Sequence, residues 1–332
     1  MSAPQGLAST ALVAIGAFLA TAPWGGASVE ALLRRGIGKN IRAEEPDAHQ
    51  RKAGTATMGG LLFLAGLTVA SVVLALLGHA RVLAPLAVML AYGALGAYDD
   101  VQGLRDAKGV GWLARYKFIT QWGVALVLAL VLYLAAGQRV LVVPLSGRVV
   151  AIGWWFVPIA ALGMVAFSNG VNLADGMDGL AGGTSAVAAG AYALIALASG
   201  QEGLGLFCAA LVGVLMAFLW FNVHPARLFM GDTGSQALGA GLAAIAMLSG
   251  HWLLLPLIGV VFVAEALSVM MQVSYFKWTR RRHGEGRRIF RMTPLHYHFE
   301  LAGMSEVQVT LRAWIVGVVA ALLGIVLALG RI

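Results

Sequence analysis

Ten long apolar stretches constrain the fold of this chain more strongly than any other feature of its sequence. A transmembrane helix needs about 20 mainly apolar residues to cross the hydrocarbon core of a bilayer. Because 60% of the 332 residues are hydrophobic and only 11% are charged, the chain has too little polar surface for a water-soluble globule. The sequence therefore predicts an all-α integral membrane protein with about ten transmembrane helices, in which residues 1–332 form a single domain. The predicted spans cover approximately residues 7–23, 58–78, 83–98, 118–136, 152–168, 180–198, 204–221, 236–250, 252–276 and 309–330.

The basic residues indicate which side of the membrane each loop faces. Of the 23 Lys and Arg residues, 19 lie in the loops that begin near residues 24, 99, 222 and 277. Since cytoplasmic loops carry an excess of Lys and Arg, these loops and the one that begins near 169 are predicted to be cytoplasmic. Both termini are then predicted to be periplasmic, in a multi-pass protein of the bacterial cytoplasmic (inner) membrane. The four remaining basic residues are Arg81, Arg139, Arg148 and Arg331.

The net charge of +8 comes from these same loops, so it does not indicate nucleic acid as a partner. The segment 277–291 is expected to continue the ninth span out of the membrane and to turn at Gly284 and Gly286. Its run of Arg residues is expected to contact anionic headgroups of membrane lipid. The single cysteine, Cys208, lies in an apolar run and is expected to be a small buried residue.

The carboxylates gather on one predicted face of the membrane. Of the fifteen Asp and Glu residues, only Glu202 is predicted to be external and only Glu265 lies within a span. Glu265 is expected to be a structural acid that pairs with a neighbouring helix. Five of the other carboxylates fall at the cytoplasmic ends of spans, and they converge on one site if the bundle closes. They are Asp99 and Asp100 at the end of the third span, Asp175 and Asp178 between the fifth and sixth, and Asp232 between the seventh and eighth.

This pattern is typical of a site for phosphate chemistry. Mg²⁺ prefers carboxylate oxygens together with substrate phosphates, and phosphoryl-type transfer depends on positioning and on neutralisation of developing charge. Small residues let backbone N–H groups approach an anion. The sequence therefore predicts an enzyme that acts on phosphates at the cytoplasmic face. Beside the carboxylates, the chain offers the glycines Gly176, Gly179, Gly182 and Gly183 and the cations or donors Lys52, Lys117, His296 and His298.

Each cluster alone also has a plainer explanation. A pair of carboxylates at a helix end is often a solvated boundary, DGMDG is compatible with a turn, and Asp232 with a helix N-cap. A transporter or a divalent-cation channel built on rings of Asp is the alternative from another class of protein. Such proteins carry ionisable residues near the bilayer midplane. Because only Glu265 lies within a span here, the sequence favours the enzyme.

Five motifs resemble those of a known family, the polyprenyl-phosphate N-acetylhexosamine-1-phosphate transferases. The family signatures DD, NxxNxxDGxDGL and FMGD read here AYDD (97–100), SNGVNLADGMDGLAGG (168–183) and FNVHPARLFMGDTGS (221–235). Two further segments resemble those of its phospho-N-acetylmuramoyl-pentapeptide transferase members. GTATMGG (54–60) is similar to GTPTMGG, and RIFRMTPLHYHFELAG (288–303) is similar to RxxPxHHHFE. The resemblance spans nearly the whole chain.

The resemblance implies a reaction, a fold and partners. Phospho-MurNAc-pentapeptide would pass from UDP-MurNAc-pentapeptide to undecaprenyl phosphate, giving lipid I and UMP, with Mg²⁺ required and Mn²⁺ as a substitute. The fold would be ten transmembrane helices with an active-site cleft on the cytoplasmic face, assembled as a homodimer. A sibling transferase that takes UDP-GlcNAc would share the catalytic core. The GTATMGG and PLHYHFE segments favour the muramoyl donor.

The same resemblance implies a role for each matching residue. Asp99 would activate the lipid phosphate, by one direct displacement or as part of a two-step route through an aspartyl-phosphoryl intermediate. Asp232 would be the principal Mg²⁺ ligand, with Asp175 and Asp178 as further ligands. The implied catalytic residues are Asp99, Asp100, Lys117, Asp232, His296 and His298. The implied substrate-binding residues are Asn169, Asn172, Asp175 and Asp178 in a polar wall, Lys52, Asn222 and Phe229 around the uracil, and Thr57 with Lys117 near the diphosphate or sugar.

Three positions depart from the family pattern. The usual DDxxK has Gly103 in place of Lys, so Arg105 or Lys108 would supply a cation if one is needed. The middle residue of the usual triple His is Tyr297, which is neutral at pH 7. The usual Pro of GTPTMGG is Ala56, which removes no chemical group. None of the three changes affects the carboxylates.

Overall fold

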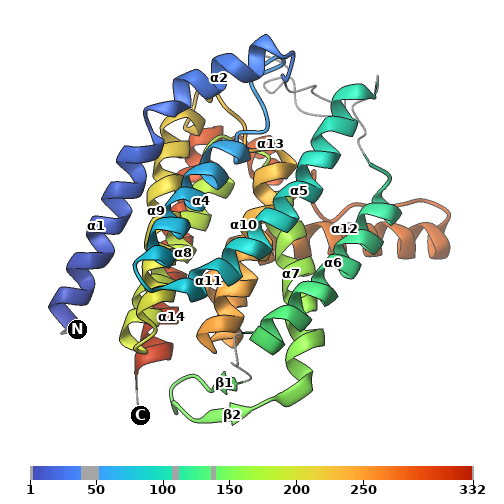
Figure 1. Ribbon diagram of the computed structural model, residues 1–332. Coiled ribbons are helices and arrows are strands. Elements are labelled where there is room, and N and C mark those ends of the chain that lie inside the picture. Colours follow the sequence, from blue (N-terminus) through green and yellow to red (C-terminus); the bar gives the residue numbers. More distant parts are fainter. Residues whose placement is uncertain (1–2, 39–51, 107–111, 136–139, 331–332) are drawn as a thin grey trace.

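The computed structural model describes residues 3–38, 52–106, 112–135 and 140–330, and they are almost entirely helical (Figure 1). Each of the ten predicted stretches coincides with a helix or with a short run of helices. The principal helices are α1 (Ala3–Thr21), α2 (Trp24–Arg34), α4 (Gly60–Leu76), α5 (Leu83–Arg105), α6 (Ala114–Ala135), α7 (Phe156–Ala174), α8 (Leu180–Ala198), α9 (Glu202–Asn222), α10 (Gly231–Ser249), α12 (Val260–His283), α13 (Leu295–Leu301) and α14 (Glu306–Leu329).

Short elements connect some of these helices. A two-stranded antiparallel hairpin, absent from the sequence expectation, precedes α7 and pairs Leu141 with Val150. Each strand has only three residues, so the fold remains helical. The short elements are η1 (Ala80–Val82), β1 (Val140–Val142), β2 (Val149–Ala151), η2 (Gly153–Trp155), η3 (Trp252–Leu254) and α11 (Leu255–Ile258).

Seven helices within the described residues are long and apolar enough to cross a membrane, namely α5, α6, α7, α8, α9, α12 and α14. The number rises to eight if α1 and α2, which meet at a bend of 41°, form one span. α4 is apolar but has only 17 residues. α10 is rich in Gly and Ala, and this composition suits a helix that faces protein and not lipid. The chain therefore folds as a multi-pass, all-α membrane protein.

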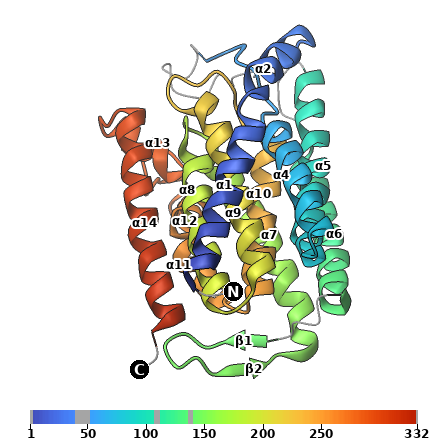
Figure 2. The same ribbon diagram turned by 60° about the vertical axis from the view of Figure 1, so that its left-hand side comes forward.

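The two ends of the bundle differ. The N and C ends of the chain and the β1–β2 hairpin lie at one end, and α2 and α13 lie at the other (Figures 1 and 2). The loops that were predicted to be cytoplasmic join helices at the α2 and α13 end. α10 lies in the middle of the bundle, where it packs against α4, α5, α7 and α8. All its residues from Thr233 to Ser249 are buried.

Glycines allow the backbone of α10 to touch its neighbours. A Cβ added to Gly96 of α5 would lie only 2.0 Å from the carbonyl oxygen of Asp232. A Cβ on Gly60 of α4 would lie 2.3 Å from the Gly234 nitrogen, and one on Gly239 of α10 would lie 2.1 Å from the Phe167 oxygen. Small residues permit helices in membranes to approach this closely, and van der Waals packing then stabilises the contact. The start of α10 is thereby fixed against both α4 and α5.

Several boundaries differ from the sequence prediction. α5 does not end at Asp99 and Asp100 but continues to Arg105, because nothing in YDDVQGLR breaks a helix. The segment 168–174, expected as a loop, is the last part of α7, and 295–301 is the helix α13. Asp232 lies in the first turn of α10 and not in a loop. The turn at Gly284 is confirmed: α12 ends there, with the glycine at φ +78°.

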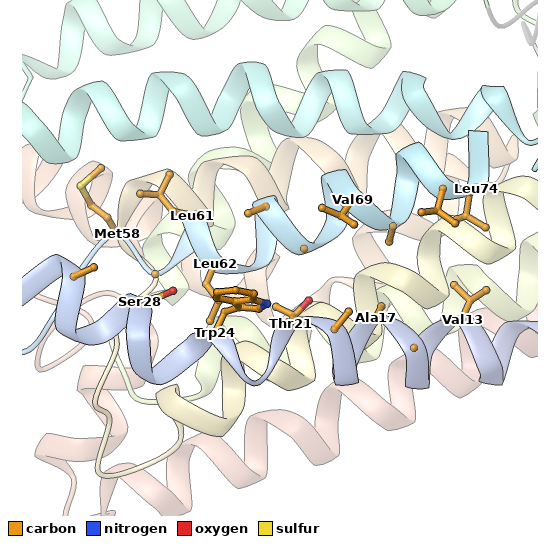
Figure 3. Close-up of a pocket in the computed structure, with 18 of the residues that line it drawn as sticks. Val13, Ala17, Thr21, Trp24, Ser28, Met58, Leu61, Leu62, Val69 and Leu74 are labelled. Atoms are coloured by element: carbon orange, nitrogen blue, oxygen red, sulfur yellow. The ribbon is translucent and has the colours of Figure 1, made fainter. Parts of the chain in front are cut away.

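An apolar cavity of about 750 Å³ runs between α1 and α4 (Figure 3). Val13, Ala17, Val69 and Leu74 line one part of it, and the part nearer the start of α4 is lined by Trp24, Ser28, Met58 and Leu62, among others. None of its lining residues is charged. The cavity therefore suits hydrocarbon and offers no group for phosphate or metal chemistry, which directs attention to the polar residues elsewhere.

We expect Gly96→Ala to destabilise the protein by about 1–3 kcal/mol, because the added methyl forces α5 and α10 apart. The matched control is Gly123→Ala in α6, where an added Cβ meets nothing within 4 Å. Thermal unfolding in detergent should show a lower midpoint for Gly96→Ala than for Gly123→Ala. Equal midpoints would mean that the contact between α5 and α10 is not as tight as described.

Candidate functional site

Asp232 is the centre of the first group of polar residues. Its Oδ1 accepts a hydrogen bond from Asn172 Nδ2 of α7 at 2.7 Å, and its Oδ2 accepts one from Gln236 Nε2 at 3.1 Å. Lys117 of α6 forms an ion pair with the same Oδ2. The Asp232 side chain keeps 26% of its surface exposed. It is therefore held by three partners and remains accessible.

Lys117 joins Asp232 to Asp99. Its Nζ lies 2.6 Å from Asp99 Oδ2, and the backbone N–H of Trp112 donates to Asp99 Oδ1 at 2.7 Å. The side chains of Asp99 and Lys117 are 11% and 18% exposed. Charge-assisted hydrogen bonds of this kind favour the ionised carboxylate. The structure thus brings together three of the predicted catalytic residues from three helices.

Asp100 accepts hydrogen bonds from the start of α10 and not from Lys117 within the described residues. Its Oδ1 accepts from the Asp232 N–H at 2.9 Å, and its Oδ2 accepts from the N–H and the hydroxyl of Thr233 at 2.9 and 2.6 Å. The first N–H groups of a helix have no partner within the helix, and a side-chain oxygen usually satisfies one of them. Here the cap comes from α5, so Asp100 fixes the backbone that carries Asp232.

A chain of amides supports this group from α6 and α7. Asn169 Nδ2 donates to Gln121 Oε1 at 2.9 Å, and Gln121 Nε2 donates to Gln236 Oε1 at 3.1 Å. Asn172 Nδ2 also lies 2.9 Å from the Ser235 hydroxyl oxygen. Because buried amides are stable only when they are hydrogen-bonded, this chain fixes the orientation of Gln236 toward Asp232. Asn172 is held toward Asp232 beside the Ser235 hydroxyl.

The charges of the first group are compatible with a divalent cation. The ammonium of Lys117 pairs with Asp99 and Asp232. Asp100 accepts from the Asp232 N–H on the far side, so the three carboxylates and one ammonium carry a formal charge of −2 when all are ionised. Mg²⁺ is bound by carboxylate oxygens and usually by one or two of them. The donor set therefore fits Mg²⁺, with Asp232 as the most exposed oxygen ligand.

Lys52 is the centre of the second group. Its Nζ lies 2.7 Å from Asp178 Oδ1 and 2.5 Å from Glu306 Oε1. Asp178 Oδ2 accepts from the Ala226 N–H at 3.1 Å and lies 3.0 Å from His224 Nδ1. Ligand atoms of Asp178, His224 and Glu306 lie within 4.8 Å of one another, a spacing that a metal ion could use. The ammonium of Lys52 already supplies a cation to both carboxylates.

The surroundings of Asp178 stabilise its charge. Burial alone would raise the pKa of this carboxyl, because its side chain is only 1% exposed. The hydrogen bond and positive charge of Lys52, with the Ala226 N–H and His224, outweigh burial and lower the pKa below its usual value. Asp178 is thus an anion whose oxygens are directed at Lys52 and at the segment 224–226, not at Asp232.

The predicted uracil residues lie beside this second group. Asn222 Oδ1 accepts from the Gly179 N–H at 3.1 Å, and Asn222 Nδ2 donates to the Leu228 carbonyl at 2.9 Å. The Phe229 ring centre is 5.9 Å from Lys52 Nζ. Thr57 is buried next to Ala56, whose carbonyl accepts from the Phe229 N–H at 2.8 Å. The structure therefore brings Lys52, Thr57, Asn222 and Phe229 together with Asp178.

His296 of α13 approaches the loop that joins α7 to α8. Its side chain is 1% exposed, and a Cβ on Gly176 would lie 2.2 Å from His296 Nε2. Glu265 Oε2 accepts from the His296 N–H at 3.2 Å and lies 3.2 Å from Nδ1. The expectation that Glu265 pairs with a neighbouring element is confirmed. Asp175, at the C-terminal cap of α7, is half-buried beside the same loop.

Tyr297 and His298, which follow His296 in the HYH triplet, have different surroundings. His298 Nδ1 accepts from the Arg291 N–H at 3.2 Å, and its ring meets Phe290 edge-on. Tyr297 packs in a small apolar cluster with Met177 and Leu180. A buried, packed position explains why Tyr can stand where the family has His. Lys108, one candidate replacement for the family's Lys at Gly103, lies outside the described residues.

Sequence reasoning missed Glu306, His224, Gln121 and Gln236. Glu306 begins α14 in a capping box formed by Ser305 and Gln308, and S-x-x-Q before an apolar run is a recognisable signal for a helix start. Nothing in the sequence shows that Lys52, 254 positions away, lies beside it. The two Gln residues lie in apolar spans, where a buried amide is itself a signal of a polar partner.

Comparison with known proteins identifies the family of this chain. The family model described as glycosyl transferase family 4 matches residues 82–250. A phospho-N-acetylmuramoyl-pentapeptide-transferase of Chloroflexus aurantiacus is 45% identical over 98% of this chain and 91% of its own length. The enzyme of the same name from Desulforudis audaxviator is 45% identical over 95% of this chain and 97% of its own length. The one from Geobacillus kaustophilus is 43% identical over 89% of this chain and 90% of its own length. The chain therefore belongs to glycosyl transferase family 4 and, within it, to the phospho-N-acetylmuramoyl-pentapeptide transferases.

Proposed function

We propose that this chain transfers phospho-MurNAc-pentapeptide from UDP-MurNAc-pentapeptide to undecaprenyl phosphate, which yields lipid I and UMP. The observation that carries the proposal is the group of Asp99, Lys117, Asn172 and Asp232, which three helices and the start of a fourth bring together. The relatives named for this activity share 40–45% of their residues with the chain over most of its length.

Asp99 is the residue best placed to accept a proton. In the direct route, it takes the proton from undecaprenyl phosphate, and the freed oxygen attacks the sugar-proximal phosphorus of the donor. The bond between that phosphorus and the bridging oxygen breaks, and UMP leaves. Lys117 pairs with Asp99 and presents an ammonium to phosphate oxygens. Asn172 and Gln236 keep Asp232 in the same place throughout.

Mg²⁺ is the proposed cofactor, with Mn²⁺ as a substitute. When bound by Asp232, it would neutralise the charge of the diphosphate. The excess of carboxylates over cations in the first group supports this proposal. Asp178 is a weaker candidate for a metal ligand than Asp232, because Lys52 already pairs with it.

The second group is proposed to bind the uridine part of the donor. Aromatic side chains commonly stack on bases, and Phe229, which is 8% exposed, would take this role. Lys52 and Asn222 offer a cation and an amide beside it. Because the second group contains neither Asp99 nor Asp232, it can hold the nucleotide while the first group acts on the phosphates.

The number of spans, the orientation in the membrane and the oligomeric state are also proposals. Ten spans would place the two polar groups at the cytoplasmic end of the bundle in the inner membrane and both termini in the periplasm. The location of 19 of the 23 Lys and Arg residues in the segments predicted to be cytoplasmic supports this orientation. A homodimer is proposed from the family resemblance.

Purified protein given UDP-MurNAc-pentapeptide, undecaprenyl phosphate and Mg²⁺ should release UMP. Asp232→Asn should lower kcat by at least about 100-fold, because charge stabilisation at the diphosphate is lost. Chelation of the metal should have a similar effect. The control Glu285→Gln, at an exposed carboxylate beyond the end of α12, should retain full activity. Release with UDP-GlcNAc but not with the muramoyl donor would contradict the proposed substrate.

The direct route predicts that no covalent intermediate forms. Enzyme incubated with UDP-MurNAc-pentapeptide and Mg²⁺ but without undecaprenyl phosphate should release no stoichiometric burst of UMP. Intact-protein mass spectrometry should show no added phospho-sugar, because the attacking oxygen belongs to the absent lipid. A burst of one UMP per chain, with the matching mass increase lost in Asp99→Asn, would establish the two-step route instead.

A further inference from the structure

Glu306 makes contacts that none of the transferase motifs accounts for. It is the first residue of α14, and its side chain is only 11% exposed. One oxygen, Oε1, accepts from both Lys52 Nζ at 2.5 Å and the Asp178 N–H at 2.7 Å. The other, Oε2, lies 3.5 Å from His224 Nδ1. A single carboxylate therefore connects three segments that are far apart in the sequence.

We propose that Glu306 is a positioning residue of the nucleotide pocket. It holds Lys52 and the Asp178 loop in the arrangement that receives the uridine monophosphate part of the donor. This inference rests on the proposed function, because it assigns the second group to the nucleotide. It goes further by assigning α14, through Glu306, a direct part in the affinity for the donor.

Three side chains of α14 hold the loop that contains Asp178. Glu306 accepts from the N–H of Asp178, Thr310 Oγ1 donates to the carbonyl of Asp178 at 3.1 Å, and Trp314 Nε1 donates to the carbonyl of Gly179 at 3.1 Å. Residues spaced by four lie on the same face of a helix. Three successive turns of α14 thus bind consecutive backbone groups of the loop, and Glu306 is the one that also reaches Lys52.

The N–H donors of Lys52 show how Glu306 can prepare this side chain for a ligand. An ammonium has three N–H donors. Within the described residues, Asp178 Oδ1 and Glu306 Oε1 accept from Lys52 Nζ, which leaves its third donor for a ligand. Two fixed partners restrict a long, flexible side chain whose ordering would otherwise cost entropy on binding. With Glu306 in place, Lys52 is held ready beside the Phe229 ring before the nucleotide arrives.

The negative charge of Glu306 cannot itself attract an anionic nucleotide. Glu306 adds a negative charge to a pocket that is proposed to receive an anion. Removal of that charge alone would therefore strengthen the binding of UMP. A positioning role predicts the opposite sign, because the neutral variant holds Lys52 and the loop less firmly. The direction of the change in affinity thus separates the two explanations.

The direct test is UMP affinity, measured by calorimetry on the full-length protein in detergent without metal. Glu306→Gln should weaken UMP binding by about tenfold, as expected for the loss of one charge-assisted contact. The matched control is Glu202→Gln, the same change at the first residue of α9, and it should bind UMP as the wild type does. Unchanged or tighter UMP binding by Glu306→Gln would overturn the proposal.

Steady-state kinetics give a readout that a merely structural role would not produce. Glu306→Gln should raise the KM for UDP-MurNAc-pentapeptide by about tenfold, with little change in kcat or in the KM for undecaprenyl phosphate. In a Lys52→Met background, the same change should have little further effect, because both residues act through one contact. A fall in kcat or in melting temperature without a change in KM or UMP affinity would refute the role.

Glu306→Asp covers the case in which the neutral variant fails to fold. It keeps the charge and the start of the helix but is one methylene shorter, so it cannot reach both Lys52 and the Asp178 N–H. It should fold and bind UMP more weakly than the wild type, and wild-type affinity would overturn the proposal. UMP release by the wild type tests the proposed function separately, since that reaction can be correct while Glu306 proves dispensable.

Discussion

The close contact between α10 and its neighbours is the constraint on which the rest of the structure depends. Gly96 and Gly60 allow α5 and α4 to touch the backbone at the start of α10, where no side chain would fit. That approach brings Asp100 within hydrogen-bonding distance of the first N–H groups of α10. Asp232, in the same turn, is thereby directed at Lys117 and Asn172. Close packing of the backbone at the start of α10 thus fixes a charged group in its first turn.

In the proposed function, two groups of charged residues at this end of the bundle have different tasks. The first, around Asp232, holds the residues suited to metal and phosphate, and the second, around Lys52, holds those suited to a nucleotide base. Each is built from side chains of different helices, so neither exists before the bundle closes. Buried ion pairs are stable only when further hydrogen bonds satisfy the remaining atoms. The amide chain from Asn169 to Gln236 and the grip of α14 on the Asp178 loop provide those bonds.

Much of the fold could be predicted from the sequence, because apolar length and the distribution of Lys and Arg are direct consequences of the bilayer. The ten stretches are helices, and the motifs with Asp99, Asp178 and Asp232 do meet near one end. The partners could not be predicted. The positions of Glu306 and Lys52 depend on how helices distant in sequence pack. The helical continuation of α5 past Asp100 could not be predicted, because paired carboxylates often mark a solvated helix end, whereas here the first N–H groups of α10 donate to Asp100.

If the two groups have separate tasks, UMP binding must survive a change in the first group. Lys117→Met removes the cation that joins Asp99 to Asp232 but touches none of the residues around Lys52. The account predicts that this variant loses turnover yet binds UMP, without metal, with wild-type affinity. If Lys117→Met lost UMP binding together with activity, the two groups would form one site and the division described here would be wrong.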